Sequence, residues 1–153
     1  MEITLSISKA SVLAEVAQTS SYTGDKMVGD EGAYERISTV DENEGELLRF
    51  WNESRADVAK TFKTLLVSEG MNAEDSDRYD LTLNVSEAFD TALQPSMVLG
   101  LFSYFVQRIA AGWYAYTNKG EAGAYADRGS ALLEEVREKA FYKKKPVPPT
   151  YDD

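Results

Sequence analysis

The side chains of this chain that could do chemistry are carboxylates, because the 153-residue sequence contains neither histidine nor cysteine. This composition excludes a Ser-His-Asp triad, a thiolate nucleophile and metal sites built on His or Cys ligands. Sites for Mg²⁺ or Ca²⁺ made only of carboxylates stay open. We therefore expect a protein that is not an enzyme and that holds no cofactor.

The nearest approach to a metal-binding pattern is the acidic segment that contains Asp75, Asp77 and Asp80. Alternating carboxylates resemble one half of a calcium-binding loop. The segment lacks the glycine and the distant glutamate that such a loop needs. We interpret it as a solvated acidic loop and expect no metal site there.

Aromatic residues offer a second kind of site, a ligand pocket around Trp113. Aromatics at helical spacing are more typical of a core, which is how we interpret Trp51 and Trp113. Trp113, Tyr114 and Tyr116 cannot share one face of a helix, since successive residues are rotated by about 100°. Some aromatic surface should therefore be exposed or covered by a partner.

Two short segments alternate apolar and polar residues, as strands with one buried face do. They are residues 2–7, with Ile3, Leu5 and Ile7, and residues 80–85. Each is too short to be stable alone, and their lengths and periods match. We predict that they pair as a two-stranded ribbon beside the helices.

The first two helices are indicated by caps and by apolar spacing. Ser8 is placed as an N-cap for a helix to about Ser21, with Gly24 suited to a C-cap. Residues 24–40 are expected to form a surface loop. Asp41 and Glu44 resemble a capping box, and the apolar stripe behind them predicts a helix that ends at Gly70.

The third helix should begin at Gln94, because Pro95 suits the first helical turn. It is the most apolar element, and Arg108 near its centre favours a buried helix over a membrane span. A short connection at 118–120 predicts an antiparallel fourth helix to about Tyr142. The residues expected in the core are Trp51, Phe62, Phe105, Ile109, Trp113, Leu132 and Val136.

Together these elements predict a mainly α, single-domain bundle over residues 1–142. It has four principal helices, a small two-stranded β ribbon and an extended C-terminal arm over residues 143–153. The net charge is −10, of which residues 1–136 carry −12 and the remainder +2. An acidic body argues against binding nucleic acid through bulk electrostatics.

The arm, residues 143–153, is the segment we expect to bind a partner. Proline fixes φ and lacks a backbone donor, so the arm cannot continue the helix and should be extended. Dipole compensation at the helix C-terminus is the other interpretation of its lysines, and a disordered linker or tail is the alternative for the arm as a whole. The residues predicted to contact a partner are Lys143, Lys144, Lys145, Pro146, Pro148, Pro149 and Tyr151.

The order of elements resembles small proteins coded in the structural gene blocks of tailed bacteriophages and prophages of Bacteroidales. The segments that carry the resemblance are the helix 46–54, the apolar helix 99–116, the connection 118–122 and the Lys143–Pro146 run. It is also similar to the helical head-to-tail connector class. No short motif is diagnostic, so no family residue can be assigned to a position here.

The resemblance implies a virion neck protein, an adaptor or head-completion subunit that forms a homo-oligomeric ring beneath the portal. Its partners would be the portal protein and a tail or second neck protein. DNA would pass without specific binding, and no membrane would be involved. The alternative is a soluble bacterial helical bundle that binds a ligand or regulates another protein.

Overall fold

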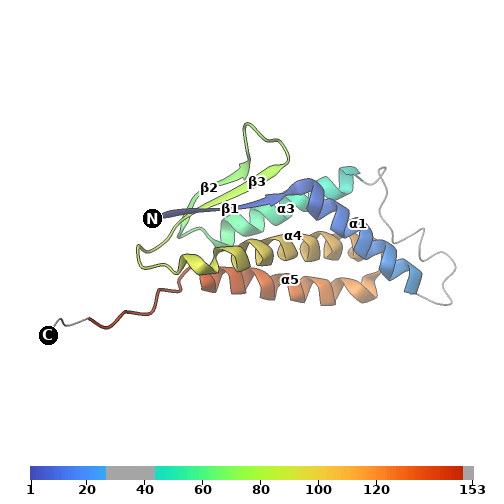
Figure 1. Cartoon of the computed structure of the whole chain (residues 1–153). Coiled ribbons are helices and arrows are strands. Elements are labelled where there is room, and N and C mark those ends of the chain that lie inside the picture. The colour runs from blue at the N-terminus through green and yellow to red at the C-terminus, as the bar shows by residue number, and fades with distance from the viewer. Residues whose placement is uncertain (27–43, 150–153) are drawn as a thin grey trace.

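The computed structural model describes residues 1–26 and 44–149, and side chains over 1–21 and 44–149. Within these residues the protein is mostly helical (62%), with four helices and a three-stranded antiparallel sheet, and is α/β rather than a bundle with a ribbon. The elements, labelled in Figure 1, are β1 (Glu2–Ser8), α1 (Lys9–Lys26), α3 (Glu44–Thr61), β2 (Leu66–Met71), β3 (Arg78–Asn84), α4 (Gln94–Thr117) and α5 (Lys119–Lys139).

The predicted pairing of residues 2–7 with residues 80–85 is confirmed. β1 and β3 are antiparallel, with a continuous register from Glu2 opposite Asn84 to Ser8 opposite Arg78. The apolar residues of both strands face the helices, and their polar residues form the outer face. This register follows from period-two patterning, because a slip of one residue would turn each apolar side chain outward.

The prediction of a two-stranded ribbon is wrong, because β2 lies on the other side of β3 in the order β1-β3-β2. It occupies sequence that we expected to be helical up to Gly70. Helix α3 instead ends at Thr61, and a turn closed by the Leu65 N–H on the Phe62 carbonyl leads into the strand. The spacing of apolar residues in this segment fits a helix as well as a strand. Its pairing with the open edge of β3 makes it a strand.

Other helix ends also differ from expectation. Helix α1 continues to Lys26, so Gly24 lies within it, and α5 ends at Lys139 rather than near Tyr142. Helix α4 begins at Gln94 as predicted, with Pro95 in its first turn. The proposed cap at Asp41 and most of the expected 24–40 loop lie outside the described residues.

The core lies between the inner face of the sheet and the helices. Its centre is an aromatic cluster in which Trp51 contacts Tyr79 and Phe105, with ring centroids 5.8 and 4.7 Å apart. Six of the seven predicted core residues are buried. Leu132 is the exception, being only partly buried, while the adjacent Leu133 turns inward.

Helix α4 lies between α3 and α5 and runs antiparallel to both (Figure 1). Two glycines permit this close packing. A Cβ added at Gly100 would lie 2.7 Å from Val136 of α5, and one added at Gly112 would lie 2.7 Å from Phe50 of α3. None of the helices in the described ranges has the length and apolarity required to cross a membrane.

Candidate docking arm and interhelical cleft

The predicted arm is fixed at its base by backbone hydrogen bonds to the segment before α4. The Asp90 N–H donates to the Tyr142 carbonyl at 3.2 Å, and the Lys144 N–H donates to the Ala88 carbonyl at 2.7 Å. These bonds form an isolated antiparallel bridge between Phe89 and Lys143. Because Phe89 is buried, the bridge joins the arm to the core.

Beyond the bridge the arm leaves the folded body (Figure 1). Residues 144–149 have neither helix nor strand, and each of them is exposed. Continued pairing would next require the Ala88 N–H to donate to the Lys144 carbonyl, but it donates to Ser86 Oγ at 3.1 Å instead. The ladder bond after that would need an N–H from Pro146, which has none, so the bridge stops there. Val147 is 88% exposed, a large solvent exposure for an apolar side chain.

The structure places six of the seven predicted partner-binding residues on this exposed arm, and Tyr151 lies outside the described residues. In the described part of the chain, the lysine side chains of the arm make no hydrogen bond or ion pair with the body. The lysines thus remain free for a partner. Dipole compensation within the chain falls instead to Lys139 and Arg137, which lie in the last turn of α5.

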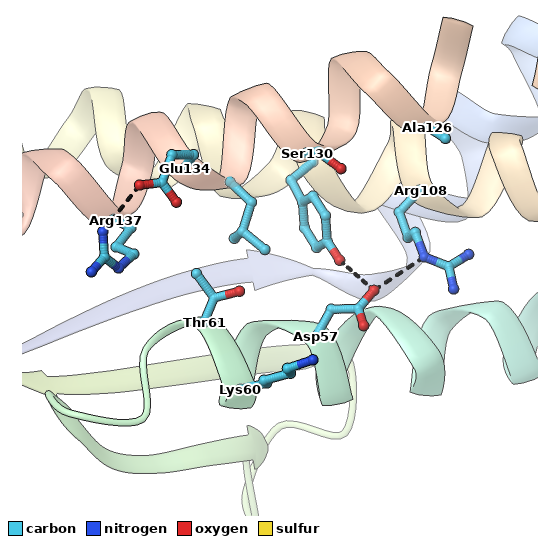
Figure 2. A pocket seen from close by; sticks show the side chains of 10 residues that line it. Asp57, Lys60, Thr61, Arg108, Ala126, Ser130, Glu134 and Arg137 are labelled. Carbon is cyan, nitrogen blue, oxygen red and sulfur yellow. Dashed lines mark hydrogen bonds and ion pairs between the residues drawn. The ribbon is translucent and has the colours of Figure 1, made fainter. Parts of the chain in front are cut away.

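A cleft of about 520 Å³ lies between α3, α4 and α5, and Figure 2 shows the side chains that line it. Helices α3 and α5 form its walls, and α4 forms its floor. The volume is within the range of small-molecule sites. Its polar lining comprises Asp57, Lys60, Thr61, Tyr104, Arg108, Ser130, Glu134 and Arg137.

Asp57 is the centre of the polar network in this cleft. Its Oδ2 accepts a hydrogen bond from the Tyr104 hydroxyl at 2.9 Å and one from Arg108 Nε at 3.1 Å (Figure 2). Arg108 also pairs with Glu53 at 3.2 Å. Burial raises the pKa of the Tyr104 phenol, and the Asp57 carboxylate raises it further. Tyr104 therefore stays a neutral donor, and the network joins α3 to α4.

Two other cations line the same cleft. Arg137 pairs with Glu134 at 3.0 Å, both on α5, and Lys60 has no ion-pair partner among the described residues. Exposed pairs one helical turn apart contribute little energy. The cleft thus offers Lys60 and a weakly held Arg137 as groups that could bind an anion.

The cleft does not lie at Trp113, where the alternative interpretation placed a ligand pocket. Trp113 is 8% exposed and belongs to the core. Sequence reasoning missed the cleft because its residues come from three helices. The available signal was Arg108, the single charged residue of the apolar helix α4. Asp57 gave none, because it is one of several charged residues on α3.

The acidic loop between β2 and β3 uses its carboxylates for local structure. Asp77 accepts hydrogen bonds from the Ser8 hydroxyl and the Ala10 N–H, at 2.6 and 2.8 Å. Asp75 accepts one from the Asp77 N–H at 3.0 Å. Within residues 1–26 and 44–149, no group of three or more acidic side chains is arranged to hold a metal ion.

No protein-family model, curated protein or solved structure matches this chain. Its function therefore has to be inferred from the surfaces described above.

Proposed function

We propose that this chain is a structural subunit of a tailed-phage virion, a head-to-tail connector that forms a ring beneath the portal. The observation that carries the proposal is the arm. It is anchored to the core by the Phe89–Lys143 bridge, and beyond the bridge it is exposed and rich in proline. Such a segment loses little conformational entropy when it docks, because the prolines already restrict it.

The charge distribution supports the same proposal. The acidic body would repel DNA passing through the ring and keep it sliding, since like charges disfavour adhesion. The basic base of the arm complements an acidic neighbour. The portal, a second neck or tail protein and an identical subunit are the proposed partners, and the assembled virion is the proposed location.

The test is a deletion that ends the chain at Tyr142. The truncated chain should fold with a nearly unchanged melting temperature, because residues 145–149 are exposed and the deletion removes only one backbone hydrogen bond to the body, from the Lys144 N–H to the Ala88 carbonyl. It should fail to bind the portal protein coded by the same phage or prophage. Native mass spectrometry of mixtures with that portal measures this directly. A truncated chain that binds and assembles like the full chain would reduce the arm to a tail.

A second candidate function is a ligand-binding or regulatory bundle, and the interhelical cleft is the observation that favours it. Its size suits a small molecule, and Lys60 and Arg137 favour an anionic one. A protein of this class stays monomeric and gains thermal stability with ligand. Thermal-shift measurements with small phosphorylated and carboxylated compounds separate the two functions, because a connector should show no such gain.

A further inference from the structure

Strand β1 has a backbone edge that no other described strand pairs with. At one end of its pairing with β3 the Val85 N–H donates to the Met1 carbonyl at 2.7 Å, and at the other end the Lys9 N–H donates to the Asp77 carbonyl at 2.9 Å. Odd-numbered residues of β1 therefore bond to β3, because successive residues of a strand direct their backbone groups to opposite sides. Even-numbered residues direct theirs to the open edge. The N–H groups there that have no acceptor among the described residues are those of Glu2, Thr4 and Ser6.

The two outer edges of the sheet differ in how well they could accept another strand. The edge of β2 is interrupted by a register shift between Leu66 and Ser68, and Glu69 turns its carboxylate inward to Arg55 of α3, 3.2 Å away. Bulges and inward-pointing charges are devices that keep an edge from pairing with another chain. Strand β1 pairs without a bulge and contains no glycine, proline or lysine. It is therefore the edge that favours strand addition.

The arm presents one edge that can pair. In the bridge, Lys144 directs its N–H to the body, so the next residues on the opposite side of the extended chain, Lys145 and Val147, direct theirs away from it. Neither of these two N–H groups has an acceptor within the described part of the chain. The positions that alternate with them are Pro146 and Pro148, which have no N–H. The arm can therefore pair on one side only, and it would end a sheet rather than extend it.

The same prolines hold the pairing residues in a conformation close to that of a strand. Lys145 precedes Pro146 and Val147 precedes Pro148, and a residue before proline is confined to the β and polyproline region. Little conformational entropy is then lost when the segment becomes a strand. The charges agree as well, because Glu2 is the one charged residue of β1 and is opposite in sign to the lysines of the arm.

The geometry favours a contact between two copies through the arm. In the structure the arm leaves the body instead of following its own β1 (Figure 1). The β1 strand of a second copy is a less suitable occupant, because α1 begins directly after Ser8 and would bring a helix to the edge with it. The arm needs only the spacing of one added strand, about 4.8 Å.

We propose that the arm of one copy adds as a further strand to the β1 edge of the next, with Lys145 and Val147 pairing with the backbone of residues 2–6. This inference rests on the proposed function and names the acceptor within the ring. Donor and acceptor are different surfaces of the chain, so the contact is head-to-tail. Contacts of this kind produce a closed ring, or a filament if the rotation does not close.

Proline substitution separates backbone pairing from side-chain contact. Lys145→Pro with Val147→Pro removes both N–H donors from an exposed segment, so the chain should fold and assembly should be lost. The matched control, Lys145→Ala with Val147→Ala, removes the same side chains and keeps both donors, so it should assemble like the wild type. Sedimentation velocity at the highest soluble concentration measures all three chains. Assembly of the proline variant, or loss of assembly in the alanine variant, would overturn the inference.

Single cysteines locate the acceptor, because the chain has no cysteine of its own. Facing Cβ atoms of paired strands lie about 5 Å apart, so a short bis-maleimide should join Thr4→Cys chains to Lys145→Cys or Val147→Cys chains in an equimolar mixture. Ser68→Cys is the matched control, since Ser68 is an exposed polar residue on β2, and it should give no such product. Cross-linking of the arm to Ser68→Cys in place of Thr4→Cys would place the arm on β2 and contradict the proposal.

The outcomes separate this inference from the proposed function. A wild-type chain that stays monomeric and forms no cross-link overturns the inference, whereas portal binding by that chain would still support the connector function. Cross-linking of the arm to Thr4→Cys without any portal binding would support the inference and refute the connector.

Discussion

Gly112 of α4 faces the ring of Phe50 of α3 so closely that a methyl group on Gly112 would lie 2.7 Å from Phe50 Cδ1. The two helices can approach to this distance only because residue 112 has no side chain. Phe50 is buried on its other sides and is stacked beneath Tyr116, so it has little room to move. The position therefore links core packing to the exposed ring of Tyr116.

We predict that Gly112→Ala destabilises the protein. Replacing a helical glycine by alanine alone would stabilise by about 1 kcal/mol. The clash with a buried ring costs about 1–3 kcal/mol and should outweigh that gain. Gly123→Ala in α5 is the matched control, since nothing lies within 4 Å of its added methyl group, and it should be neutral or stabilising. Chemical denaturation measures both, and an equally stable Gly112→Ala would show that the helices separate easily.

Trp113→Ala should lower the free energy of unfolding by about 3–5 kcal/mol, because it leaves a large cavity in the core. Trp113 is only 8% exposed. Leu99→Ala, at an exposed site on the same helix, should change the stability by no more than about 0.5 kcal/mol. Urea unfolding distinguishes the two. A loss below about 1 kcal/mol for Trp113→Ala would mean that its pocket collapses without penalty.

Period-two patterning was sufficient to predict the β1–β3 pair, and proline placement was sufficient for the start of α4. The error at β2 has a physical cause. Leu65 and Leu66 continue the apolar spacing of α3, and neither glycine nor proline marks the end of the helix at Thr61. Only the vacant edge of β3, a tertiary feature, favours a strand there.

The site was predicted in part, for similar reasons. The arm was visible in the sequence because its prolines act locally. Trp113, Tyr114 and Tyr116 were predicted not to share one helical face, so that some aromatic surface would be exposed. Tyr116 is the exposed residue, whereas Trp113 and Tyr114 are buried. The cleft was not visible, since Asp57 and Arg108 are 51 residues apart and meet only when α3 packs on α4.

The hydrogen bond between Tyr104 and Asp57 should contribute to the free energy of unfolding, and a double-mutant cycle measures this contribution. Tyr104 is 3% exposed, so Asp57→Ala leaves a buried hydroxyl without its acceptor, at a cost of about 1–3 kcal/mol. In a Tyr104→Phe background the same substitution should cost less, because no hydroxyl is left unpaired. Lys60→Ala, on the same wall of the cleft, should be near neutral. Additive effects of Tyr104→Phe and Asp57→Ala would show that the bond contributes nothing.

Stability should fall at acid pH partly through Asp80. Burial alone would raise the pKa of this carboxyl, but hydrogen bonds outweigh burial and hold the pKa below its ordinary value of 3.8. The donors, at 2.6 to 3.1 Å, are Ser6, Asn72 and Arg78. A lowered folded-state pKa gives stability that is present above pH 3.8 and is lost as the pH falls through the folded value.

Asp80→Asn should therefore be less stable than the wild type at neutral pH and should lose less stability between about pH 4 and pH 2. Asp127→Asn is the control, because Asp127 is exposed on α5 and makes no hydrogen bond or ion pair within the described residues. Thermal unfolding across this pH range gives the comparison. If Asp80→Asn and the wild type lose the same amount of stability over this pH range, the loss is due to other carboxylates.

The last prediction concerns DNA. Residues 1–136 carry a net charge of −12, so duplex DNA should be repelled by most of the surface. We expect no retention of duplex DNA in a mobility-shift measurement at about 150 mM salt, where exposed charges still interact over about 8 Å.

The chain that ends at Tyr142 is the informative control, because it removes the lysine run and leaves the acidic body. If the full chain binds DNA tightly, weakens steeply with salt and loses binding on truncation, the arm is a nucleic-acid contact. Binding that persists in the truncated chain would instead reveal a basic face on the body and would contradict a passive channel lining.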